Sequence, residues 1–116
     1  MAEATLDVKF EQNGKVKIVS LFGPIDSATH DYFKNTMDPL FLTPGAFVLI
    51  DCTGLTYINS KGLSLLARYH RACLVTFGAM SVCNVNRKLV RTMDLLGLGK
   101  ILKFYENREQ ALAAMV

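Results

Sequence analysis

A continuous apolar run, AFVLID at residues 46–51, constrains the fold more than any other stretch of this 116-residue chain. The run contains no polar residue before Asp51, whereas a strand with one face in water alternates apolar and polar residues. Such a strand has to be covered on both faces, and in α/β proteins helices cover both faces of a mostly parallel sheet. The run therefore predicts the central strand of an α/β fold.

The first part of the chain predicts a pair of antiparallel strands. Short apolar segments at residues 5–11 and 15–22 lie on either side of Asn13-Gly14, a dipeptide typical of tight hairpin turns. Gly23-Pro24 then interrupts the pattern and ends the second strand. We expect the sheet to open with this hairpin.

A helix is expected next. Asp26 or Ser27 can cap its N-terminus, because both side chains accept hydrogen bonds from free backbone N–H groups. The helix should end before Pro39 or before Pro44, since the residue preceding a proline is pushed out of the α region.

The second half of the chain alternates helices and strands. After Ser60, apolar residues recur at spacings of three and four, which predicts a helix at about residues 61–75 with Ser60 as its N-cap. The further elements we expect are a strand at 79–85, a helix that Asn86 caps and Gly97 ends, a strand at 101–105, and a helix from Asn107 to about Met115. The order ββαβαβαβα predicts one mixed sheet of about five strands with about four helices, in a single domain over residues 1–116.

Charge and composition exclude several classes of function. The net charge of +3 comes from 13 basic and 10 acidic residues without a block of like charges, so no nucleic-acid partner is indicated. We see no signal segment at the start and no apolar run of membrane-spanning length, so we expect a cytoplasmic protein without membrane insertion. Cys52, Cys73 and Cys83 lack metal-site spacing, and we expect reduced thiols, at least partly buried.

The chain shows no motif of an enzyme, and we expect no catalysis, cofactor or metal. His30 and His70 lie at no metal-ligand spacing from another His, Cys or carboxylate. The Gly97-Leu98-Gly99 pair lacks the third glycine of a phosphate-binding loop. Cys52 lies near a strand end, but nothing adjacent in the sequence supplies a base to activate it.

Ser60 is the residue whose position suggests a regulatory role. As a helix cap it would contribute about 1 kcal/mol of stability and nothing more. A phosphate on it would add roughly two negative charges beside free N–H groups and the positive end of a helix dipole. The fold would then tolerate the modification while the surface seen by a partner changed. From the residues alone, both interpretations stay open.

Several stretches in order resemble a STAS domain, the fold of bacterial anti-sigma factor antagonists. The similar stretches are Gly23-Pro24-Ile25-Asp26, LIDCTGLTYINSKGLSLLARYHRA at 49–72, NVNRKLVRTMDLLGLGKIL at 84–102 and NREQALAAM at 107–115. The resemblance covers essentially the whole chain. Its most specific part is the family's Asp-Ser-x-Gly-Leu at a helix start, which reads Asn59-Ser60-Lys61-Gly62-Leu63 here.

The resemblance implies a binding protein with a phosphorylation switch. In the family, the unphosphorylated form binds a kinase-like anti-sigma factor, so that the sigma factor is released. That serine kinase phosphorylates the motif serine, here Ser60, and a metal-dependent serine phosphatase restores it. The partner surface carries over to Asn59, Ser60, Lys61 and Gly62, with Asp26 contributing from the loop before the first helix. A homodimer stays open.

Two departures from the family pattern surround the serine. Asn59 stands where the family usually has Asp, and Lys61 occupies a position that is more often small, so the site is two charge units more positive. Lys61 could stabilise a phosphoserine, or a kinase that needs the Asp could reject the site. Alternatives of another class are an accessory subunit of a lipid-transport ATPase and a scaffold constituent of a stress-signalling assembly.

Overall fold

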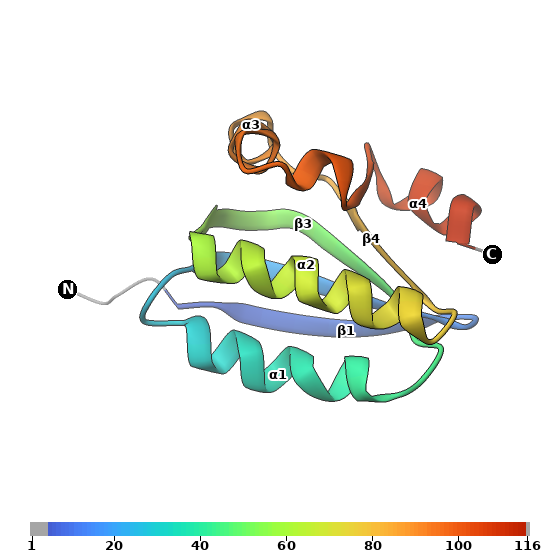
Figure 1. The fold of residues 1–116 in the computed structure, drawn as a ribbon. Coiled ribbons are helices and arrows are strands. Elements are labelled where there is room, and N and C mark those ends of the chain that lie inside the picture. The colour runs from blue at the N-terminus through green and yellow to red at the C-terminus, as the bar shows by residue number, and fades with distance from the viewer. Residues whose placement is uncertain (1–4, 116) are drawn as a thin grey trace.

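One mixed five-stranded sheet carries helices on both faces (Figure 1). The structure is a computed structural model and describes residues 5–115. The strands are β1 (Asp7–Asn13), β2 (Val16–Ile25), β3 (Phe47–Ile58), β4 (Ala79–Cys83) and β5 (Lys103–Tyr105). The helices are α1 (His30–Leu42), α2 (Ser60–Val75), α3 (Arg87–Leu95) and α4 (Arg108–Met115), with a 3₁₀ turn, η1, at Leu98–Lys100. The strands lie side by side in chain order, β1 antiparallel to β2 and the others parallel. The predicted element order and mixed sheet are confirmed.

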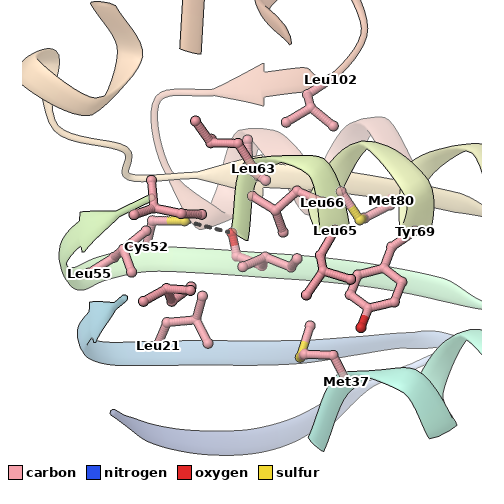
Figure 2. Close-up of a cluster of buried hydrophobic side chains, with 14 of the residues drawn as sticks. Leu21, Met37, Cys52, Leu55, Leu63, Leu65, Leu66, Tyr69, Met80 and Leu102 are labelled. Carbon is pink, nitrogen blue, oxygen red and sulfur yellow. Dashed lines mark hydrogen bonds between the residues drawn. The ribbon is translucent and has the colours of Figure 1, made fainter. Parts of the chain in front are cut away.

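The apolar run forms the central strand β3 and is buried on both faces, as expected. Val48 and Ile50 face the larger core, which the sheet shares with α1, α2 and α3. Leu49 faces the opposite way, into a smaller core that includes Ala111 and Met115 of α4. Figure 2 shows the larger core, with leucines of α2 packed over the sheet.

The opening hairpin is confirmed, but several strand bounds differ from the prediction. Asn13 belongs to β1 and pairs with Val16, so the two-residue loop is Gly14-Lys15, and Gly14 takes the left-handed φ of +58° that this turn needs. β4 and β5 are shorter than expected. β3 continues past Asp51 to Ile58, because it keeps pairing with the end of β2.

The start of α1 was predicted wrongly. Neither Asp26 nor Ser27 is its N-cap: the cap position is Thr29, which makes no side-chain cap hydrogen bond. The helix also contains Pro39 and ends at Leu42, ahead of Pro44. Met37, before Pro39, is buried in the core, and Leu40 and Phe41, after it, pack against the core. This packing offsets the loss of the backbone hydrogen bond that the proline cannot donate.

The caps of the last two helices agree with the prediction. Asn86 Oδ1 accepts a hydrogen bond from the backbone N of Leu89 at 2.9 Å, at the start of α3. Asn107 Oδ1 accepts one from the N of Gln110 at 2.9 Å, just before α4. Gly97 follows α3 with a φ of +79°, the conformation that commonly ends a helix.

The turn from α2 to β4 is tight. The backbone N of Gly78 donates to Cys73 O at 2.8 Å, and the next residue, Ala79, donates to Ala46 O at 3.0 Å. Phe77 in this turn has a φ of +63° and is 92 % exposed. The turn therefore brings the backbone of Gly78 directly against the segment that leads into β3.

Candidate functional site

The site that the sequence predicts lies where β3 ends and α2 begins. Ile58 pairs with Ile25 at the ends of the parallel strands β3 and β2, and Asn59 N donates to Ile25 O at 3.0 Å. Asn59 is extended and is the N-cap: its Oδ1 accepts from Gly62 N at 2.9 Å, and its O accepts from Leu63 N at 3.0 Å. The strand pairing therefore fixes where α2 starts.

Ser60 is not the cap, and the prediction that it would be is wrong by one residue. It is the first residue of α2 and its side chain is exposed, because Asn59 already satisfies the free N–H group of Gly62. The serine hydroxyl is therefore not needed to cap the helix. Asn and Ser are equally good caps, so the sequence could not separate them.

Gly62 is buried under the first turn of α2. A Cβ atom at this position would lie 2.8 Å from Ile25 Cγ2 and 2.8 Å from Ile58 Cγ1. Only a glycine lets the start of α2 sit this close to the ends of β2 and β3. Its role in the described structure is to place Ser60 and Lys61 at the surface.

Asp26 lies at the same end of the sheet, in the loop between β2 and α1. Its Oδ1 accepts hydrogen bonds from the backbone N of Ala28 and of Thr29, each at 3.0 Å. The Thr29 hydroxyl donates to Pro24 O at 2.9 Å and closes the loop. Asp26 directly follows Ile25, whose carbonyl accepts a hydrogen bond from Asn59 N. Its carboxylate therefore holds this loop in place beside the start of α2.

Three shallow hollows meet at Ser60. One lies between α1 and α2, one between α2 and η1, and one between the end of β3 and α3, with volumes of about 290, 330 and 240 Å³. Ligand pockets measure about 300–1,000 Å³ and enclose most of the ligand. The three hollows lie around the lower end of this range, so each is large enough for a protein side chain.

The cysteines are free and buried, as predicted, and none is an activated nucleophile. Burial raises the pKa of the Cys73 thiol to about 11 and that of the Cys83 thiol to about 12. Burial also raises the pKa of the Cys52 thiol, which is within 3.9 Å of Ile50 O (Figure 2). All three thiols stay protonated near neutral pH, and a protonated thiol is a poor nucleophile. Within residues 5–115, His, Cys, Asp and Glu form no group of three or more suited to a metal ion.

A polar cluster on the α4 face of the sheet was not predicted. Asp51 Oδ2 accepts hydrogen bonds from Arg108 Nε at 3.2 Å and Nη2 at 2.9 Å. Its Oδ1 accepts from Thr53 N at 3.0 Å, Thr53 Oγ1 at 2.7 Å and Asn84 Nδ2 at 3.1 Å. Burial alone would raise the pKa of Asp51, but these hydrogen bonds outweigh it and hold the pKa below its usual value. The cluster ties α4 to the sheet.

Known proteins resemble this chain in both sequence and architecture. The sequence profile of the STAS domain matches residues 7–111. The anti-sigma F factor antagonist of Paenibacillus polymyxa is 29% identical over 111 residues, which are 95% of each chain. A crystal structure of an anti-sigma factor antagonist from Mycobacterium paratuberculosis superposes with a TM-score of 0.85 and 24% identity, covering 95% of this chain and 93% of that one. The Bacillus cell fate determinant SpoIIAA in its phosphorylated form gives 0.71 and 15%, covering 95% and 100%.

The match extends from β1 into α4 and so includes every strand of the sheet and the Ser60 junction. No helix in residues 5–115 combines the length and the apolar character needed to cross a bilayer. The element order agrees with that of the solved relatives. The chain belongs to the STAS domain family.

Proposed function

We propose that this protein is an anti-sigma factor antagonist that binds a kinase-like anti-sigma factor when Ser60 is unmodified and releases it when Ser60 is phosphorylated. The observation that carries the proposal is the exposed Ser60 at the first position of α2, where three hollows meet. Asn59, Lys61, Gly62 and Asp26 would complete the partner surface. Relatives named for this activity support the assignment.

The local geometry is compatible with a phosphate on Ser60. The first turn of a helix offers free N–H groups and the positive end of its dipole, and both favour an anion. The cap bond from Gly62 N to Asn59 Oδ1 does not use the Ser60 side chain. A phosphoryl group would therefore alter the docking surface without removing a hydrogen bond that holds α2.

The binding half of the proposal is tested by affinity capture from a lysate of the native organism. We expect wild type and Ser60→Ala to retain a kinase-like anti-sigma factor and Ser60→Asp to retain at least about tenfold less, equivalent to about 1.4 kcal/mol. Gln12→Glu is the matched control, because it adds one negative charge at an exposed position of the β1–β2 hairpin, away from the three hollows. Equal capture by all variants, or capture of transporter subunits instead, would contradict the proposal.

The charge balance at Ser60 gives a separate prediction about its phosphorylated form. We expect Asn59→Asp to raise the second pKa of the phosphoserine by about half a unit, because a nearby negative charge disfavours the dianion. Titration followed by ³¹P NMR measures this pKa. Lys61→Ser should raise it too, since it removes a nearby positive charge, and a pKa unchanged in both variants would contradict the prediction.

Equal rates of phosphorylation in wild type and Asn59→Asp would show that the kinase does not need an acid at this position.

A further inference from the structure

The surface around Ser60 is strongly basic. Five lysine and arginine side chains line the three hollows: Lys34, Lys61, Arg68, Arg71 and Lys88. No Asp or Glu of residues 5–115 lines any of the three. Lys34 Nζ is paired with Asp38 Oδ2 at 2.7 Å. The other four are exposed and, within the described part of the chain, have no carboxylate within 4.0 Å. We call these four residues, Lys61, Arg68, Arg71 and Lys88, the basic face.

The basic face places four of the protein's 13 basic side chains around Ser60, on a surface that no described Asp or Glu lines. The chain as a whole has 13 basic and 10 acidic residues, so its net charge is only +3. The positive charge at this surface is therefore denser than the average over the molecule. An uneven field of this kind attracts a partner of opposite charge and orients it before contact.

Apolar side chains lie among these charges on the α3 side of Ser60. Tyr57 is 52 % exposed, Leu96 56 % and Ile101 40 %, and they line the two hollows there. Protein interfaces typically have an apolar centre with aromatic residues and a polar rim. The basic face and this apolar group together have the character of a protein-docking surface.

We propose that the partner that docks over Ser60 presents an acidic surface with an apolar side chain at its centre. This inference rests on the proposed function, because it takes that partner to be the kinase-like anti-sigma factor. The partner's carboxylates pair with the basic face, and its apolar side chain contacts Tyr57, Leu96 and Ile101. Phosphorylation of Ser60 adds roughly two negative charges, which cancels about half of the four positive charges and repels the partner's carboxylates.

Association rates with the purified kinase-like anti-sigma factor test the inference. The double variant Arg71→Glu/Lys88→Glu changes the charge by −4 outside the predicted Ser60 motif. We expect it to associate at least about tenfold more slowly than wild type at low salt and to lose most of its salt dependence. The control is Lys15→Glu/Lys17→Glu, with the same charge change in the β1–β2 hairpin region at the opposite end of β2 from Ile25. It should stay within about threefold of wild type.

A second measurement does not depend on the kinase. Poly-L-glutamate titrated into the isotope-labelled protein should shift backbone NMR signals around the basic face and not around the hairpin. Shifts spread evenly over the surface would overturn the inference, whether or not a kinase binds. A kinase that binds wild type and the Arg71/Lys88 variant at equal rates would overturn it while leaving the proposed function intact. Duplex DNA that competes with poly-L-glutamate at equal charge and binds more tightly would assign the face to a nucleic acid instead.

Discussion

Replacing Asp51 with alanine will lower the free energy of unfolding by about 2–3 kcal/mol, because hydrogen-bond donors that are at least partly buried lose their acceptor. Asp51 is only 6 % exposed, and its carboxylate accepts hydrogen bonds from Thr53, Asn84 and Arg108. Without the carboxylate, Thr53 N and Asn84 Nδ2 lose an acceptor, and Arg108 keeps only Glu11 and Ser20 as partners. Urea unfolding followed by circular dichroism measures the change.

Glu11→Ala is the matched control for Asp51→Ala. Glu11 Oε2 lies 2.9 Å from Arg108 Nη1, the same guanidinium, but its side chain is 53 % exposed. Exposed ion pairs contribute about 0–1 kcal/mol, so this variant should stay close to wild type. If Asp51→Ala and Glu11→Ala lose equal stability, the hydrogen bonds of Asp51 are not what holds α4 against the sheet.

The same cluster predicts how stability depends on pH. The pKa of Asp51 is lower in the folded protein than its unfolded value of about 3.9, so the folded state favours the ionised carboxylate. Its contribution is complete above the unfolded pKa and is lost as the pH falls through the lower folded pKa. We expect Asp51→Asn to lose less stability between pH 5 and pH 2 than wild type, a difference that thermal melts would resolve.

Gly78→Ala should destabilise the protein by about 3 kcal/mol, at the upper end of the range for overpacking. A Cβ at this position would clash with Ala46 O and lie 2.8 Å from Ala46 N. Backbone atoms cannot rotate aside as a side chain can, so the turn after α2 has to move and weaken the hydrogen bond from Ala79 to Ala46 O. Thermal and urea unfolding would measure the loss.

Gly14→Ala separates this close approach from backbone strain. Gly14 has a left-handed φ of +58°, but a Cβ there would meet no atom within 4 Å. Its cost should be limited to the strain of an alanine in that conformation, about 1–2 kcal/mol. A Gly78→Ala loss no larger than this would show that the turn can relax around a methyl group.

Local patterns were sufficient to predict the central strand and the caps of α3 and α4, but not those of α1 and α2. The run at 46–51 predicted that both faces of β3 are covered, and Asn86 was identifiable as a cap because it directly precedes the apolar helical pattern of α3. The start of α2 was ambiguous, because two capping residues are adjacent. Asn59 is the cap because β3 stops pairing with β2 at Ile58, and this pairing depends on tertiary structure that the local sequence does not show.

Local sequence patterns could not predict how the residues of the polar cluster and of the basic face come together, because these residues lie on elements that are far apart in the sequence. Arg108 is 57 residues from Asp51, and no spacing rule links them until the sheet and α4 are assembled. Similarly, Arg71 and Lys88 lie on different helices, and only the packing of α2 beside α3 places both around Ser60. The motif located Ser60 and the charge of Lys61, but not which other charges α2 and α3 bring beside them.

The capping of α2 by Asn59 separates two tasks that could have fallen on one side chain. If Ser60 had been the cap, the phosphorylation proposed above would have modified the side chain that holds the first turn of the helix. With Asn59 as the cap, that hydrogen bond does not use the Ser60 hydroxyl. Under the proposed switch, a phosphate at position 60 would therefore change the docking surface while the scaffold beneath it keeps its own hydrogen bond.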